Sequence, residues 1–146
     1  MSLHGVSASK TRARRLDGID DRVFKAGSCL SGGVVGRGET CGALTGGMLA
    51  IGNEIGRERL EDVEQLRKAR GSATELYLRL HEEVGHTVCG EIHKLKFGRT
   101  YRLYDPEDQK AFHEVGGHGD DGCPKVCATA ARITADILLR LRGKAC

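Results

Sequence analysis

The sequence predicts an all-α fold, a single compact helical domain of four to five helices with a glycine-rich N-terminal loop. First, apolar residues recur at three- or four-residue steps from Leu76 to Leu95 and from Val126 to Leu141, a spacing that places them on one helix face. Second, Asp105-Pro106 and Cys123-Pro124 are typical helix starts, because proline suits the first helical turn. Third, a chain of 146 residues that is 39% hydrophobic is long enough to bury one core.

The N-terminal part divides into a polar arm and a glycine-rich loop. Residues 1–26 are polar and rich in arginine, so we expect an arm ahead of a helical, cysteine-containing domain over residues 27–146. The glycines of residues 27–38 permit backbone conformations closed to other residues and predict a turn-rich loop. That loop lacks the Gly-Lys-Ser/Thr of a phosphate-binding loop and the third glycine of a dinucleotide fingerprint, so no nucleotide motif is present.

A first helix is predicted near residues 40–52. Cys41, Leu44 and Met48 fall on one side of it and form an apolar stripe. Gly42 and Gly46 fall on another side, where the lack of side chains lets a second backbone come close. We therefore expect another helix to pack there, either from the same chain or from a second subunit in a homodimer.

The remaining helices follow from periodicity and from breaking residues. The segment 54–70 is charged and amphipathic, and Gly71-Ser72 is expected to break it. Its expected buried positions are Leu60, Val63 and Leu66. The predicted helices after this segment lie near residues 72–96, 106–115 and 124–142.

Composition and charge exclude several classes of protein. The 23 basic and 20 acidic residues leave a net charge of +3, and only 4% of residues are aromatic, so we expect no nucleic-acid partner. No apolar run approaches the ~20 residues that a membrane span requires, and we expect no membrane association. The N-terminal residues lack the pattern of a secretory signal. We therefore expect a cytoplasmic protein whose six cysteines are kept reduced.

Reduced cysteines point to metal binding or redox chemistry rather than to a disulfide framework. Cys123 and Cys127 are four residues apart, so their sulfurs can meet one metal ion or each other. Cys41 and Cys123 both fall in the first turn of a predicted helix, where backbone N–H groups and the helix dipole favour the thiolate. Cys89 is expected in the middle of the predicted helix 72–96, among apolar residues. Each cysteine taken singly also fits an ordinary core position.

Histidines near these cysteines are further candidate ligands. Cys89 and His93 could form a Cys-x-x-x-His ligand pair, although a solvated helix histidine is the preferred interpretation for His93. Residues 81–86 carry two histidines without the i, i+4 spacing of a zinc protease. His113 and His118 are expected in a solvated loop near Cys123, and the sequence lacks a Cys-x-x-Cys-His haem motif.

The cysteines and the glycine loop together resemble a known family. Residues 36–47 read Gly-Arg-Gly-Glu-Thr-Cys-Gly-Ala-Leu-Thr-Gly-Gly, and Cys89 and a Cys-Pro-Lys-Val-Cys segment follow. This combination resembles the C_GCAxxG_C_C family, whose members are helical and presumed to be redox-active. The resemblance implies Cys41, Cys89 and Cys123 as functional cysteines, with Cys127 as a further candidate. Cys29 could join this set or act as a resolving thiol, whereas Cys146 is expected to have no role.

We therefore expect a cysteine-centred redox protein in which Cys41, Cys89, Cys123 and Cys127 converge between helices. The leading hypothesis is electron transfer through a metal centre ligated by these four cysteines, an iron–sulfur cluster in preference to zinc. The same thiols could instead cycle between dithiol and disulfide. Both hypotheses imply a redox protein as partner. A hypothesis from another class is a non-catalytic interaction module stabilised by zinc.

Overall fold

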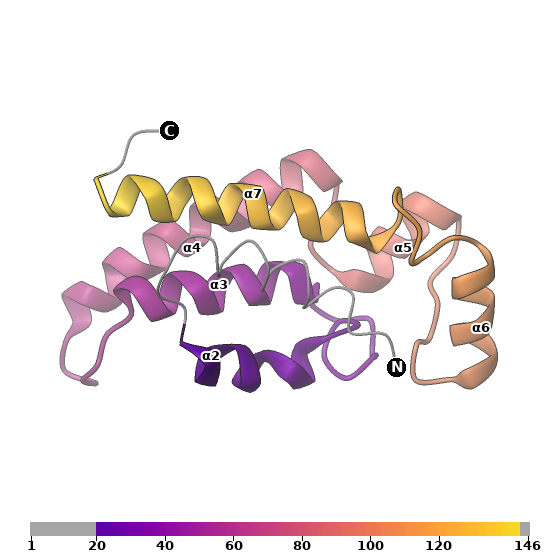
Figure 1. Ribbon diagram of the computed structural model, residues 1–146, viewed down its shortest axis with the longest axis horizontal. Helices are drawn as coiled ribbons and strands as arrows, with labels where there is room; N and C mark the ends of the chain where they lie inside the picture. The colour runs from indigo at the N-terminus through magenta and orange to yellow at the C-terminus, as the bar shows by residue number, and fades with distance from the viewer. Residues whose placement is uncertain (1–19, 144–146) are drawn as a thin grey trace.

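The computed structural model describes residues 20–143, which form helices and loops without a β-strand, so the all-α prediction is confirmed (Figure 1). The described part of the chain contains one α-helix more than the four to five expected, because residues 21–26 of the expected arm are helical. Its helices are α2 (Asp21–Ala26), the 3₁₀ helix η1 (Gly27–Leu30), α3 (Gly42–Ile55), α4 (Val63–Val84), α5 (Cys89–Phe97), α6 (Pro106–Glu114) and α7 (Cys123–Leu141).

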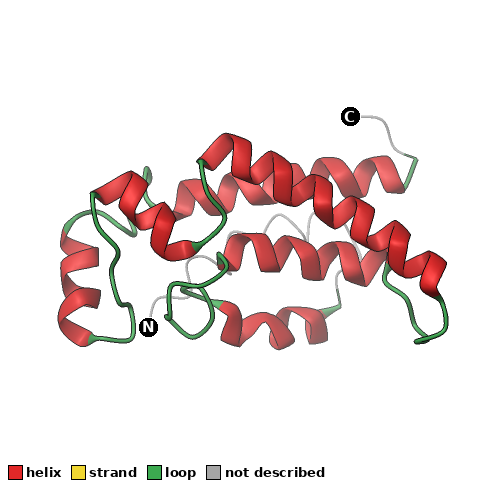
Figure 2. Ribbon diagram, turned by 180° about the vertical axis from the view of Figure 1, so that it is seen from behind, coloured by secondary structure: helices red, strands yellow, loops and turns green. Residues whose placement is uncertain are grey.

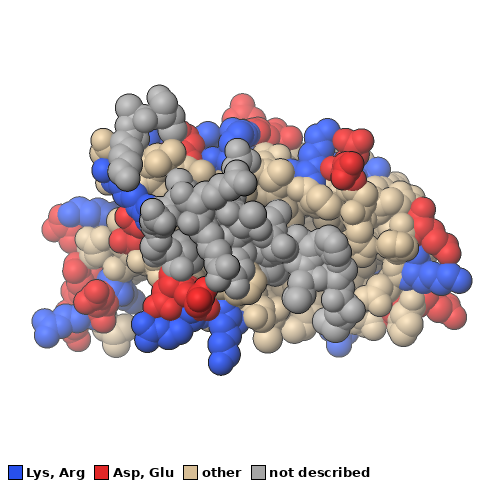
Figure 3. Space-filling view, viewed as in Figure 1, with Lys and Arg blue, Asp and Glu red and all other residues tan. Residues whose placement is uncertain are grey.

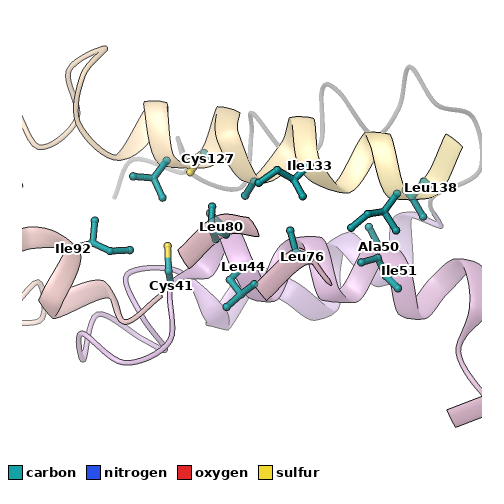
Figure 4. Packing of buried hydrophobic residues seen from close by; sticks show 14 residues of the cluster. Cys41, Leu44, Ala50, Ile51, Leu76, Leu80, Ile92, Cys127, Ile133 and Leu138 are labelled. Carbon is teal, nitrogen blue, oxygen red and sulfur yellow. The ribbon is translucent and has the colours of Figure 1, made fainter. Parts of the chain in front are cut away.

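The core lies between the three longest helices. In Figures 1 and 2, α7 runs along α3 and α4, and each of the three packs against the other two. Leu44 from α3, Leu76 from α4 and Ile133 from α7 are fully buried, and Figure 4 shows their side chains between the helices. Burying each such side chain stabilises the fold by about 1.5–3 kcal/mol. This core fixes where the N-terminal ends of α3 and α7 lie.

The structure shows close packing along α3 at Gly47 and at Gly42. A Cβ atom at Gly47 would lie 2.5 Å from Oγ1 of Thr134 and 2.6 Å from Cδ2 of Leu76, so α3 approaches both α7 and α4 here. At Gly42, a Cβ atom would lie 2.9 Å from the carbonyl oxygen of Leu30. Helices of the same chain therefore pack closely against α3 at these glycines, where no side chain separates the backbones.

The break between the second and third predicted helices is in a different place. α4 continues through Gly71, where a Cβ atom would meet nothing within 4 Å. A glycine there costs about 1 kcal/mol relative to alanine, which packing of the helix on its neighbours offsets. The chain turns instead at Gly85, which ends α4 with a left-handed φ of 97°. Cys89 consequently begins α5 rather than lying within a long helix.

The predicted helix 54–70 is instead the end of α3, a connection over residues 56–62 and the start of α4, and none of its three expected core positions is fully buried. Leu60 and Val63 are 76% and 47% exposed, and Leu66 is half-buried. α4 starts only after Asp62, whose side chain accepts a hydrogen bond from the Gln65 backbone nitrogen. Capping by this aspartate satisfies one of the free N–H groups of the first turn, which sets the helix start.

α6 begins where the sequence predicted. The Asp105 side chain accepts hydrogen bonds from the backbone nitrogens of Glu107 and Asp108, and Pro106 occupies the first turn. Figure 1 shows α6 beside α5 at one end of the molecule. The C-terminal side of α6 thereby brings Phe112 close to α5, where its ring centroid lies 4.5 Å from that of His93.

Charged side chains of both signs are interspersed on the face shown in Figure 3, in line with the small net charge. Two ion pairs connect core helices across the surface. Arg79 of α4 contacts Asp136 of α7 at 2.6 Å, and Arg142 after α7 contacts Glu54 of α3 at 2.6 Å. Within residues 20–143, every helix is too short or too polar to cross a membrane.

Candidate functional site

A short antiparallel backbone pairing brings Cys41 and Cys89 together. Thr40 pairs with Val88 in an isolated β-bridge. On either side of it, the Cys41 nitrogen donates to the carbonyl of residue 87 at 2.8 Å, and the Cys89 nitrogen donates to the carbonyl of residue 39 at 2.7 Å. Because side chains alternate along extended segments, Cys41 and Cys89 leave this pairing on the same side. The pairing therefore sets the N-terminal ends of α3 and α5 side by side.

The glycine-rich loop packs directly on Cys89. Gly33 is buried, and a Cβ atom there would lie 2.6 Å from Cβ of Cys89. All five residues 32–36 have a positive φ, including Val34 at 59° and Val35 at 48°. Left-handed backbone costs about 1–2 kcal/mol for a residue other than glycine, so two valines make this a strained turn. Backbone hydrogen bonds within the loop hold it in place.

Cys123 and Cys127 face the first pair from the start of α7. Cys123 is half-buried and Cys127 is 6% exposed. The Cys123 nitrogen donates to the Gly117 carbonyl at 2.9 Å, and a Cβ atom at Gly122 would lie 2.4 Å from that same oxygen. This contact fixes the first turn of α7. Figure 4 shows the sulfurs of Cys41 and Cys127 on the facing sides of α3 and α7.

Burial and the Cys41 thiol together raise the pKa of the other three thiols. Burial raises the pKa of Cys89, and the thiols of Cys41, Cys123 and Cys127 raise it further. Burial, followed by the Cys41 thiol, raises the pKa of Cys123 to about 11 and that of Cys127 to about 12. Cys41 is therefore the neighbour that the other three share. We call Cys41, Cys89, Cys123 and Cys127 the thiol cluster.

A position at a helix start does not make these thiols acidic, contrary to the prediction for Cys41 and Cys123. The backbone N–H groups of Ala43 and Leu44 do lower the pKa of Cys41, but burial raises it by more. Lys96 lowers the pKa of Cys123 less than burial and Cys41 raise it. Loss of water around a thiolate outweighs the stabilisation that a helix terminus provides.

His93 is the residue that sequence reasoning placed wrongly. It was expected in solvent, but it is fully buried, and its Nε2 lies 3.6 Å from Sγ of Cys89. Its Nδ1 has no hydrogen-bond partner among the residues that the structure describes. Burial lowers the pKa of His93, so the ring is neutral at neutral pH. The spacing of four residues from Cys89 was the signal available in the sequence.

The other candidates lie at the edge of this site or beyond it. Cys29 is exposed in η1. His118 is half-buried, and its ring centroid lies 5.2 Å from that of Phe112 and 5.7 Å from that of the exposed His113. Cys146 and residues 1–19 of the expected arm lie outside the described residues.

The thiol cluster has the donor chemistry of a thiophilic metal site but not a closed arrangement of ligands. Thiolates bind zinc and iron–sulfur clusters. Within residues 20–143, however, the structure contains no group of three or more histidine, cysteine, aspartate or glutamate side chains that could hold a metal ion. The five cysteines of this part of the chain are all free thiols.

The fold and the site define an all-α protein with four cysteines at or near the starts of three helices, namely Cys41, Cys89, Cys123 and Cys127. The chain belongs to the family described as "Putative redox-active protein (C_GCAxxG_C_C)", which matches residues 7–137. The resemblance seen in the sequence is thereby confirmed. No curated protein and no solved structure matches the chain.

Proposed function

We propose that this redox protein exchanges electrons by converting the thiol cluster between dithiol and disulfide. The observation that carries the proposal is the backbone pairing that sets Cys41 and Cys89 side by side at two helix starts. Cys41 also raises the pKa of Cys123 and Cys127, which lie in the first turns of a third helix. Sulfurs that belong to different helices can approach when a helix end shifts slightly. Two sulfurs of one ideal helix are more constrained, since a disulfide requires particular Cβ positions.

Access to the cluster favours Cys123 as the thiol that meets a partner. Cys123 is half-buried, whereas Cys41, Cys89 and Cys127 are 9%, 5% and 6% exposed. The partner in this proposal is a protein or a small molecule that carries a disulfide. Its electrons and protons would enter or leave through Cys123, while the buried thiols complete the exchange.

The exchange takes place in two balanced steps. The Cys123 sulfur attacks one sulfur of the partner's disulfide, the partner's S–S bond breaks, and the first partner thiol leaves with the Cys123 proton. A second thiol of the cluster then attacks the Cys123 sulfur, and the mixed disulfide breaks. The second partner thiol leaves with the second proton. The cluster has lost two electrons and two protons, which the partner has gained.

A redox titration of the full chain, purified without oxygen, tests this proposal. The protein is equilibrated in buffers of oxidised and reduced dithiothreitol, and its thiols are alkylated and located by peptide mass spectrometry. We expect two cluster thiols to disappear together in one two-electron step. Cys41→Ala should abolish this step, and Cys146→Ala should leave it intact. Failure to find any reversible disulfide within the cluster would overturn the proposal.

The same preparation distinguishes the other hypotheses for these cysteines. Visible absorbance accompanied by iron and labile sulfide would show an iron–sulfur centre. A colourless protein that contains stoichiometric zinc would show the zinc-stabilised module. Either result would replace dithiol cycling as the proposed chemistry. A colourless, metal-free protein with a reversible disulfide would support it.

A further inference from the structure

We infer that His93 accepts and returns the proton of the Cys89 thiol when the cluster exchanges disulfides, an inference that rests on the proposed function. Sγ of Cys89 and Nε2 of His93 lie 3.6 Å apart, within hydrogen-bond distance for sulfur. The two residues are one helical turn apart on α5, so the helix itself maintains the contact. Cys89 is thus the buried thiol of the cluster that lies against an imidazole.

The surroundings of His93 hold its ring against Cys89. The ring centroid lies 4.5 Å from that of Phe112 and 6.1 Å from that of Tyr101. Phe112 is itself confined, because a Cβ atom at Gly117 would lie 2.4 Å from its ring. A fully buried imidazole packed in this way has no route to solvent by a simple side-chain rotation. It is placed to act on one sulfur rather than to move between several.

Burial and the titratable groups that face the ring keep it neutral before the reaction. These groups are the Cys89 thiol from α5, Tyr101 from the loop after α5, and His118 from the loop before α7. Burial and the charge of His118 both oppose a second proton on His93, while the backbone of Tyr101 favours it to a smaller extent. The ring is therefore neutral before the reaction. Nε2 is the acceptor when the single ring proton is on Nδ1.

A buried thiol needs such a base more than an exposed one. Cys89 is 5% exposed, and burial together with three neighbouring thiols disfavours its thiolate. Water cannot easily take its proton at this depth. An imidazole in contact can take the proton as the sulfur attacks, so that no isolated thiolate has to form.

The step balances in both directions. In oxidation, the Cys89 sulfur attacks a sulfur of a disulfide that involves another cluster thiol, and its proton passes to Nε2 of His93. The S–S bond under attack breaks, a new S–S bond to Cys89 forms, and the displaced sulfur takes the proton from Nε2 of His93, so that the ring is neutral again. In reduction, His93 takes the proton of the attacking thiol and passes it to the Cys89 sulfur as that sulfur leaves.

The test compares His93→Gln with His113→Gln, which removes an exposed histidine from α6. The probe is oxidised glutathione, and the rate at which Cys89 enters a disulfide is followed by alkylation and peptide mass spectrometry. General base catalysis typically contributes about 100-fold or more, so we expect a loss of about that size at pH 7 in His93→Gln. The loss should shrink as pH rises and hydroxide replaces the imidazole. In His113→Gln, Cys89 should enter a disulfide at the wild-type rate. The mixed disulfide at Cys123 should form at the wild-type rate in both variants.

Two outcomes separate this inference from the proposed function. An unchanged rate and pH profile for Cys89 in His93→Gln, with a reversible cluster disulfide still formed, would overturn the role of His93 alone. A wild-type cluster that forms no disulfide would overturn both. If His93→Gln does not fold, His93→Phe keeps a ring in the same space and should show the same loss.

A measurement on the wild-type protein needs no variant. The ¹⁵N chemical shifts of the His93 ring report which nitrogen carries the proton. We expect the proton on Nδ1 and an unprotonated Nε2 facing Cys89. A ring protonated on Nε2 in the reduced protein could not accept the Cys89 proton there and would contradict the inference.

Discussion

Gly33 lies so close to Cys89 that a Cβ atom at position 33 would be 2.6 Å from Cβ of Cys89. The same Cβ atom would be 2.6 Å from the backbone nitrogen of Glu39, which cannot move away without breaking the loop. The contact also requires a φ of +70° at Gly33. The glycine loop can thus pack directly against Cys89 only because residue 33 has no side chain.

Gly33→Ala should therefore destabilise the protein more than Gly98→Ala does. Gly98 also has a positive φ, +82°, but a Cβ atom there would meet nothing within 4 Å. The left-handed backbone alone costs about 1–2 kcal/mol in Gly98→Ala. Gly33→Ala adds a steric clash, which typically costs a further ~1–3 kcal/mol. Urea unfolding of both variants measures the difference, and equal losses would show that the loop does not press on Cys89.

Helical glycines offer a second matched pair. Gly47→Ala should destabilise the core by about 1–3 kcal/mol, because its Cβ would lie 2.5 Å from Oγ1 of Thr134. Gly71→Ala should stabilise α4 by about 0.5–1 kcal/mol, since that position is open and glycine is a poor helix residue. Thermal unfolding monitored by circular dichroism should show shifts of opposite sign. Shifts of the same sign would contradict the packing described for α3.

The reactivity of Cys123 should keep increasing to an unusually high pH. Its pKa is raised to about 11, mainly by burial, and only the thiolate is alkylated by iodoacetamide. The rate should thus rise about tenfold per pH unit well beyond pH 9. A free cysteine in a peptide, with a pKa of about 8.5, levels off there. Peptide mass spectrometry resolves Cys123 from the other thiols, and a plateau near pH 9 would contradict its burial in the cluster.

Acid should weaken the loop that carries Tyr101. The pKa of Asp108 is lowered to about 2, first by the hydrogen bond from the Arg102 backbone nitrogen and then by Arg99. Because the folded pKa lies below the unfolded value, the ionised carboxylate stabilises the fold above about pH 4. That contribution disappears as pH falls through the folded pKa.

Asp108→Asn should accordingly lower the melting temperature at pH 6, and its difference from the wild type should vanish toward pH 2. Melting curves between pH 2 and pH 6 measure this. The control is Glu82→Gln, an exposed carboxylate on α4. A gap between Asp108→Asn and the wild type that persists unchanged at pH 2 would show that charge is not its cause.

The positions of several helices could be predicted from the sequence because their signals are local. Periodic burial along α7 and the Asp105-Pro106 start of α6 depend on residues within a few positions of one another. The choice between Gly71 and Gly85 as the helix break could not be made this way. Both are glycines in a helical pattern. Because α4 packs on its neighbours, the helix continues through Gly71 and ends at Gly85.

The sequence by itself determined the all-α class, the family and the identity of the four cysteines in the proposed cluster. Tertiary structure decided the chemical state of those cysteines and the burial of His93. The pKa of a thiol depends on how much water surrounds its sulfur, and helices distant in sequence determine this burial. For Cys41 and Cys123, burial raises the pKa by more than nearby groups lower it. His93 is buried because Tyr101 and Phe112, from later segments, cover its ring. No local pattern around His93 specifies contacts that form only when α5, α6 and the loop between them come together.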